Sequence, residues 1–394
     1  MAEVLNLADK PRKKRLAIFL DGTWNAVGDN TNVWRLKSLC APQDSSGVVQ
    51  LVYYDIGVNG FIGGAFGKGL NDNVTEAYEW LIDNYSSGDD IFIFGFSRGA
   101  YTARSLAGLI AKHGLLKAGA PLGVKQLYGR YKRKDDQTVW QLQRANSLGE
   151  LKDATVEETW LLKYSQPINI KVVAVWDTVG ALGVPVFSIQ GISRQTFGFL
   201  HTGLRTMIEH GYHALALDEH RRDFAPTLWT VRKPKDGGFT APPRDIFSVE
   251  QRWFVGAHAN VGGGCESDLL AQIPLRWIMK KASAHGLAFK NDVDLDGNVL
   301  KAPISDSFRE FMHGIYSVFA KRFYRAVGAE PEQAEDGTHT TVNETIDSTV
   351  FERWRKDPRY RPASLDQWAR RKQVDPAMVA QSVRADDPNV AAPD

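Results

Sequence analysis

The segment 91–99 constrains the fold of this chain more than any other part of its sequence. Residues 91–95 form the apolar run IFIFG, residues 95–99 read Gly-Phe-Ser-Arg-Gly, and a helical pattern begins directly afterwards. A strand, a sharp turn and a helix are the three parts of a nucleophile elbow, whose strained backbone exposes the serine hydroxyl. Gly95 and Gly99 let the strand and the helix approach each other closely. The alternative is a glycine-rich turn in which Ser97 only caps the helix.

Strand patterns alternate with helical patterns along the rest of the chain. Short β-branched and aromatic runs predict strands at 16–20, 48–55, 91–95 and 170–176, with a weaker signal at 248–255. Apolar residues repeat with helical spacing over 74–81, 103–110 and 275–282. This alternation predicts an α/β fold, α/β-hydrolase-like, with a mostly parallel central sheet flanked by helices and interrupted by cap or lid insertions.

Two of the later strands end in residues that an activated serine needs. Asp177 follows the strand at 170–176, and His258 follows the strand at 248–255 and precedes the glycines at 262–264. A serine nucleophile requires a base and a carboxylate that orients the base, and in this architecture they follow in the order serine, acid, histidine. The sequence therefore predicts a catalytic Ser97–Asp177–His258 triad. Taken alone, Asp177 is equally consistent with an ordinary turn.

An oxyanion hole requires two backbone N–H groups near the nucleophile. One is expected from Arg98, the residue after the serine, and the other from Gly22 or Thr23, in the loop that follows the first strand. Asp21 in the same loop either shapes the loop or binds a cation, and the structural role is favoured.

Composition argues against several other functions. The chain has 394 residues, a formal net charge of +2 and two cysteines, which gives no sign of a nucleic-acid partner or a disulfide framework. The glycine-rich segment 63–69 does not match the spacing of a phosphate-binding loop. His201, His210, His213 and His220 lie in a stretch that looks helical and lacks nearby cysteines, so hydrogen-bonded histidines are favoured over a metal site. We expect no cofactor and no metal.

The chain divides into three parts. A basic arm at 1–14 precedes a catalytic domain at 15–325, which carries insertions at about 115–168 and 185–245. A C-terminal extension at 326–394 is expected to pack on that domain, with a linker-like stretch at 330–337 and a frayed, disordered tail over its last dozen residues. The N-terminus shows no signal-peptide pattern, so we expect synthesis in the cytoplasm, with any delivery outside the cell using no signal peptide.

Several motifs in order resemble those of one protein family. It is the α/β-hydrolase catalytic domain family that includes the phospholipase effectors of bacterial type VI secretion. The similar stretches are 19–25 (FLDGTWN), 95–100 (GFSRGA), 175–180 (VWDTVG), 216–219 (ALDE) and 256–264 (GAHANVGGG). Resemblance extends from about residue 15 to residue 362. One departure is Asn260, which stands where the family usually has Asp and which is expected to shape the loop or face a cation there.

The resemblance implies an esterase or phospholipase whose triad matches Ser97, Asp177 and His258. The implied partners are a lipid or acyl-ester substrate, a membrane surface, and an immunity protein or a component of the secretion machinery. Two alternatives remain open at this point: a small-molecule esterase, and a non-catalytic interaction module on a hydrolase fold.

Overall fold

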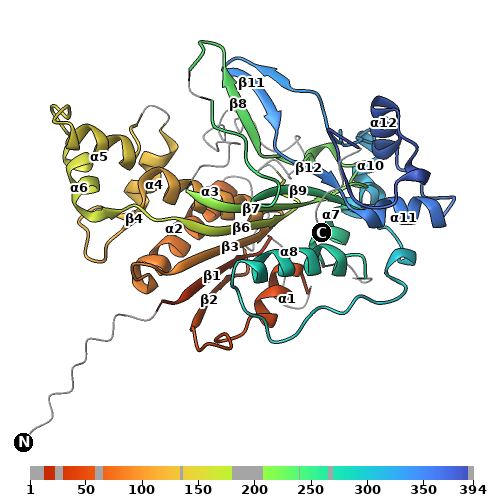
Figure 1. Cartoon of the computed structure of the whole chain (residues 1–394), viewed down its shortest axis with the longest axis horizontal. Coiled ribbons are helices and arrows are strands. Elements are labelled where there is room, and N and C mark those ends of the chain that lie inside the picture. The colour runs from red at the N-terminus through yellow and green to blue at the C-terminus, as the bar shows by residue number, and fades with distance from the viewer. Residues whose placement is uncertain are drawn as a thin grey trace, which may run out of the picture.

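The computed structural model describes residues 13–22, 30–57, 65–133, 136–179, 207–238, 240–264 and 269–388. Its centre is an eight-stranded sheet in the order β13-β12-β9-β7-β6-β3-β1-β2 (Figure 1). The strands are β1 (Arg15–Leu20), β2 (Gln50–Asp55), β3 (Asp90–Phe96), β6 (Ile170–Trp176), β7 (Ile208–Ala216), β9 (Val249–Phe254), β12 (Glu344–Ile346) and β13 (Val383–Arg384). Neighbours pair in parallel except β12 and β13. The predicted α/β fold with a mostly parallel sheet is confirmed.

Helices cover both faces of this sheet. Successive residues of a strand point to opposite faces, and on both faces they are apolar. Leu16, Ile18 and Ile93 face one core with α2 and α3, and Phe19 and Phe94 face the other with α1 and α8. The bounds are α1 (Asn32–Leu39), α2 (Ala65–Asn84), α3 (Arg98–His113) and α8 (Gln272–Ala284). Predicted helices at 74–81, 103–110 and 275–282 lie within α2, α3 and α8, and α2 extends well beyond the predicted range at its N-terminal end.

Three further groups of elements surround the central layers (Figure 1). A helical lobe contains β4 (Leu115–Leu116), α4 (Val124–Lys132), α5 (Val139–Ser147), α6 (Val156–Tyr164) and β5 (Ser165–Gln166). A small three-stranded sheet contains β8 (Thr230–Pro234), β10 (Glu332–Ala334) and β11 (Gly337–Thr341). The remaining elements are η3 (Arg222–Phe224), α7 (His258–Gly262), η4 (Val299–Lys301), α9 (Ser307–Glu310), η5 (Phe311–Gly314), α10 (Ile315–Phe319), α11 (Ser348–Lys356), α12 (Ala363–Lys372) and η6 (Pro376–Met378).

Three sequence-based expectations are wrong in detail. The stretch around His210 and His213 is not helical, since both residues lie on β7, a strand of the central sheet inside the predicted insertion at 185–245. The expected linker at 330–337 contains β10 and the start of β11, which pair as a hairpin. The expected tail begins with β13, which pairs with β12, whereas 389–394 lie outside the described residues. In each case backbone pairing orders a stretch that contains polar side chains.

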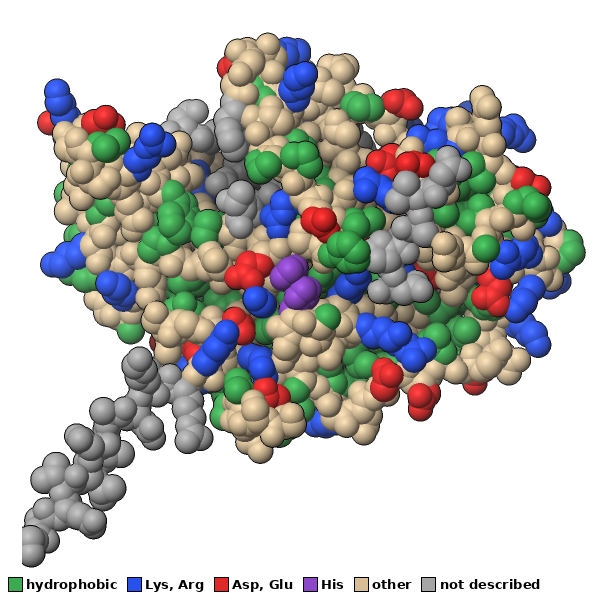
Figure 2. Space-filling view, in the orientation of Figure 1, with side chains coloured by type: hydrophobic (Ala, Val, Ile, Leu, Met, Phe, Trp, Pro, Cys, Tyr) green, Lys and Arg blue, Asp and Glu red, His purple; other side chains and the backbone are tan. Residues whose placement is uncertain are grey.

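The surface gives no sign of a single dominant charge on the face shown in Figure 2, where acidic, basic and apolar side chains are intermixed. Among the residues that the structure describes, no helix is both long enough and apolar enough to cross a bilayer.

Candidate active site

Ser97 lies at the turn between β3 and α3, at the carboxyl edge of the sheet. Its backbone has φ 57° and ψ −119°, a conformation that costs a residue with a side chain about 1–3 kcal/mol. The turn is tight, because a Cβ on Gly95 would lie 2.4 Å from the Gly99 carbonyl oxygen, and one on Gly99 would lie 2.1 Å from that of Leu20. The Ser97 N–H donates to the Trp176 carbonyl at 3.1 Å. The geometry is that of the predicted elbow.

Asp177 and His258 reach Ser97 from the ends of other strands at the same edge. Asp177 follows β6, which neighbours β3, and His258 is the first residue of α7 after β9. The His258 Nε2 lies 2.8 Å from the Ser97 Oγ, and its Nδ1 lies 2.6 Å from Asp177 Oδ2. All three side chains are buried or nearly so. The structure therefore joins the three residues into one hydrogen-bonded chain, in the order that nucleophilic serine catalysis requires.

The carboxylate of Asp177 is fully buried and heavily hydrogen-bonded. Its Oδ1 accepts the Ala216 N–H at 3.0 Å, and both oxygens accept from the guanidinium of Arg325. Burial alone would raise the pKa of Asp177, but the positive charge of Arg325 and the hydrogen bond from His258 hold that pKa well below its ordinary value. Asp177 is therefore an anion at neutral pH.

His258 is enclosed by aromatic rings and held through its backbone. Its ring packs against Phe96 at 4.7 Å and Phe224 at 5.1 Å between centroids. Burial lowers its pKa below the ordinary 6.5, and the neighbouring Asp177 opposes only part of that effect. The imidazole is therefore neutral at neutral pH, with a nitrogen free to accept a proton from the serine.

Glu219 accepts a hydrogen bond from the backbone of His258. Its Oε2 accepts the His258 N–H at 3.3 Å and the Ser307 hydroxyl at 2.8 Å. Both of its oxygens accept from Arg221, whose guanidinium lies over the Phe224 ring at 3.4 Å. Burial would raise the pKa of Glu219, but the bonds from Arg221 lower it to about 2. This ion pair fixes the loop that carries His258.

Only part of the predicted oxyanion hole lies within the described residues. Arg98 is the first residue of α3, so its N–H lies at the N-terminal end of that helix, directly after Ser97. The Gly22 N–H already donates to Asp21 Oδ1 at 2.8 Å, which argues against it as an oxyanion donor. Thr23 lies outside the described residues.

Asp21 and Asn260 both make contacts that shape their own loops. Asp21 accepts from the Thr31 hydroxyl at 2.5 Å and from the Tyr54 hydroxyl at 3.1 Å. The Asn260 Oδ1 accepts the backbone N–H groups of Ala257, at 3.1 Å, and Ser305, at 3.0 Å. Within the described part of the chain no group of three or more His, Cys, Asp and Glu side chains is placed to hold a metal ion. These contacts favour loop-shaping roles over cation binding.

Comparison with known proteins identifies the family of this chain. The family model of the catalytic domain of Tle1-like phospholipase effectors of type VI secretion (T6SS) matches residues 14–281. The chain belongs to the Tle1-like phospholipase effector family. The matched region contains Ser97, Asp177 and His258 and ends before Arg325.

Three relatives of this Tle1-like chain differ from it in length. The uncharacterized protein YEL023C of Saccharomyces cerevisiae is 29% identical over 240 residues, which cover 55% of this chain and 33% of that protein. A crystal structure of an uncharacterized protein from Pseudomonas aeruginosa has a TM-score of 0.42 at 15% identity, covering 78% of this chain and 51% of the other. The structure of the Tle1 effector bound to the VgrG spike has a TM-score of 0.35 at 16% identity, covering 66% and 53%. This chain thus spans about a third to a half of each relative.

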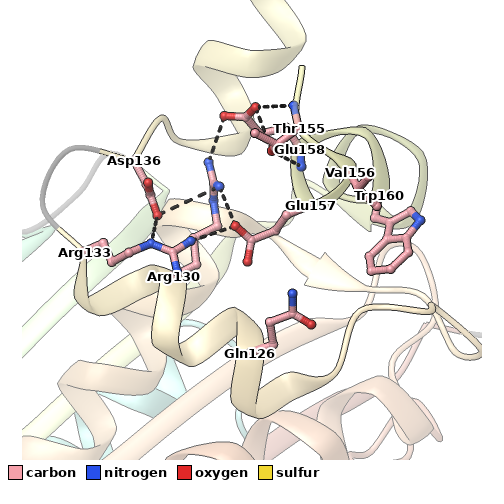
Figure 3. Close-up of a pocket in the computed structure, with 9 residues that line it drawn as sticks. All are labelled: Gln126, Arg130, Arg133, Asp136, Thr155, Val156, Glu157, Glu158 and Trp160. Atoms are coloured by element: carbon pink, nitrogen blue, oxygen red, sulfur yellow. Dashed lines mark hydrogen bonds and ion pairs between the residues drawn. The ribbon is translucent and has the colours of Figure 1, made fainter. Parts of the chain in front are cut away.

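One pocket among the described residues of this Tle1-like protein lies away from the triad. A cavity of about 580 Å³ lies between α4 and α6, and Figure 3 shows Arg130 and Arg133 directed towards Asp136 and Glu157. The Arg130 Nη1 lies 2.9 Å from Glu157 Oε2, and the Arg133 Nη2 lies 2.7 Å from the same oxygen. Both arginines of this cavity are therefore paired with acidic side chains of its own wall. Within the insertion at 185–245 the sequence offers four candidates for the wall of an acyl pocket, which are equally consistent with ordinary core. These residues, Phe187, Phe197, Phe199 and Leu200, lie outside the described residues.

Sequence reasoning missed several residues that surround the triad. Arg325 and Arg221 each stand in a stretch with other basic residues and no recognisable motif. Glu219 belongs to the ALDE stretch that resembles the Tle1-like family, and that resemblance was the one signal that could have marked it.

Proposed function

We propose that this protein is a serine-dependent hydrolase of acyl esters, acting as a phospholipase of the type VI effector kind. The observation that carries the proposal is the chain of hydrogen bonds from the Ser97 hydroxyl through His258 to the Asp177 carboxylate, at 2.8 and 2.6 Å. Such a chain activates a hydroxyl that is unreactive on its own.

The proposed reaction has two steps. In the first, Ser97 Oγ attacks the ester carbonyl while His258 Nε2 accepts the hydroxyl proton, and the histidine then returns that proton to the leaving alcohol. Asp177 stabilises the imidazolium that forms, and the Arg98 N–H, with Thr23 as a candidate second donor, stabilises the oxyanion. In the second step, His258 accepts a proton from water, whose oxygen attacks the acyl carbonyl. The histidine then returns the proton to Ser97 Oγ as the acyl–serine bond breaks and the fatty acid leaves.

Family membership supports phospholipid as the substrate class, and one surface feature supports action at a membrane. The side chains of Ile315, Val318 and Phe319 on α10 are 57%, 74% and 74% exposed. Aromatic contacts connect α10 to the base, since Tyr316 packs on Phe311, Phe311 on Phe224, and Phe224 on His258. We propose that this α10 patch (Ile315, Val318 and Phe319) inserts between phospholipids, with the exposed Arg309 and Lys321 facing anionic headgroups.

The cellular context rests on the family alone. Delivery outside the producing cell by type VI secretion, contact with a component of that machinery and neutralisation by an immunity protein all belong to this proposal.

The first experiment compares the wild-type protein with Ser97→Ala on p-nitrophenyl esters and on phospholipid vesicles. Loss of the catalytic hydroxyl is expected to lower kcat by about 10⁴-fold or more, because no other group can form the acyl-enzyme. A fluorophosphonate should label the wild type and not the variant. Equal hydrolysis by two folded proteins would exclude Ser97 as the nucleophile.

A further inference from the structure

Arg325 makes a buried ion pair with the carboxylate of the triad. It lies between α10 and β10, outside the region matched by the family model, and its side chain is 0% exposed. Its Nη1 donates to Asp177 Oδ1 at 2.6 Å and its Nη2 to Asp177 Oδ2 at 3.0 Å. The C-terminal part of the chain thus reaches the centre of the candidate active site.

The guanidinium is itself held in one orientation. Its Nη1 also donates to the Ala216 carbonyl at 2.7 Å, and its Nη2 to the Phe224 carbonyl at 2.5 Å. Two hydrogen bonds therefore hold it against the end of β7 and against η3, besides the two that it makes to Asp177. A planar fork held in this way fixes the plane of the carboxylate that it binds.

The fixed carboxylate in turn orients the histidine. Asp177 Oδ1 accepts from the Ala216 N–H, which leaves Oδ2 to accept from His258 Nδ1 at 2.6 Å. A hydrogen on Nδ1 leaves Nε2 unprotonated and facing Ser97. If Asp177 became protonated, His258 would lose the anionic acceptor that selects this tautomer.

We propose that Arg325 is a positioning residue for the hydrolytic reaction, holding Asp177 ionised and in plane so that His258 is presented to Ser97 as a neutral base. This inference rests on the proposed function. It assigns part of the active site to a segment beyond the matched catalytic domain.

The charge of Arg325 makes a pH profile the decisive measurement. If its removal lets the buried Asp177 protonate, activity returns only when a higher pH ionises the acid. If Asp177 stays ionised without its partner, its charge stabilises protonated His258 more strongly. Both routes move the acid limb of the kcat/KM profile to higher pH, whereas a role in stability alone lowers the amount of folded enzyme and leaves that limb in place.

The experiment compares Arg325→Gln, Arg325→Lys and a control, Arg252→Gln, by p-nitrophenyl butyrate hydrolysis and fluorophosphonate labelling between about pH 5 and 9. Arg252 is matched for burial and pairing, since its side chain is 3% exposed and bonds Glu250 at 2.7 Å. Arg325→Gln should lower kcat/KM at neutral pH by about 10²-fold or more, and should raise the acid limb by about one pH unit or more. Arg325→Lys keeps the positive charge but loses the planar guanidinium with its two donors. Its kcat should fall by about tenfold, whereas its KM and the acid limb of its kcat/KM profile should stay near wild type.

Each outcome decides the inference. A folded Arg325→Gln enzyme with the wild-type acid limb overturns it, and so does an Arg252→Gln control that shows the same shift. If Arg325→Gln does not fold, Arg325→Lys decides, because a wild-type kcat in that variant refutes positioning by the fork. The proposed function is tested separately, by ester hydrolysis with the Ser97→Ala variant. If that variant is active, the proposed function is wrong, whatever the Arg325 variants do.

Discussion

At the residue scale, His258 must be neutral to act as a base, and its surroundings fix the pH range in which it is. Burial lowers the pKa of His258 below 6.5, while Asp177, whose own pKa is depressed, stays ionised throughout that range. We therefore expect kcat/KM to be at its plateau at pH 7 and to fall as the pH drops, with a midpoint below 6.5.

This profile is measured with a short soluble ester, and circular dichroism at each pH verifies that the protein stays folded. Ionisation of the substrate does not contribute, because a p-nitrophenyl ester has no titrating group in this range. A midpoint above 6.5 in the folded wild-type enzyme contradicts the environment described for His258.

The residues of the candidate site differ in how clearly the local sequence pattern predicts their positions. Ser97, Asp177 and His258 each follow a strand that the sequence predicts, and parallel strands end at one edge, so the sequence could predict that the three lie close together. Arg325 follows no strand and reaches Asp177 across 148 residues of sequence. A single arginine in a basic stretch carries no signal of its partner, so only the folded chain reveals the pair.

At the element scale, the elbow between β3 and α3 depends on a close approach that only glycine permits. A Cβ on Gly99 would lie 2.1 Å from the Leu20 carbonyl oxygen and 2.5 Å from that of Asp21, so β1 or α3 must move. We expect Gly99→Ala to lower the free energy of unfolding by about 1–3 kcal/mol, as overpacking usually does.

Gly129 provides the matched control for that prediction. It lies inside α4, and an added Cβ there meets no atom within 4 Å. Gly129→Ala should raise the free energy of unfolding by about 0.5–1 kcal/mol through its helix propensity. Urea denaturation measures both variants, and changes of the same sign would be evidence against the close approach at the elbow.

The strands that sequence patterns missed have polar residues in the buried sheet. β7 contains His210, Gly211 and His213, which interrupt its apolar run, yet His213 is fully buried and its Nε2 accepts the Thr178 N–H at 3.1 Å. β12 is only three residues long, and its Glu344 is buried with Oε2 accepting from the Trp253 indole at 2.8 Å. Internal hydrogen bonds offset the cost of burying these polar groups. They join residues that are distant in sequence, so the sequence patterns could not predict the pairs.

At the scale of the whole molecule, the chain after residue 281 packs against the region that the family model matches. β12 extends the central sheet beyond β9, and α11 and α12 bury a core that includes Trp253 of β9 and Phe351 and Trp368 of the helices. The same C-terminal part supplies Arg325 to the triad and the α10 patch to the surface. Substrate access and chemistry are therefore expected to depend on this region as well as on residues 14–281.

The α10 patch (Ile315, Val318 and Phe319) gives the last prediction. If it inserts into lipid, Val318→Asp with Phe319→Asp should weaken binding of the inactive Ser97→Ala protein to phosphatidylglycerol vesicles by about tenfold or more, because each buried side chain contributes about 1.5–3 kcal/mol. Hydrolysis of a soluble ester by the same variant with Ser97 restored should stay near wild type, since neither side chain reaches the triad. Met378→Asp is the control, because Met378 is 80% exposed on η6, outside the patch. Equal vesicle binding by all three proteins would remove the patch from the membrane contact, whereas a selective loss caused by the α10 substitutions would place the site against the bilayer.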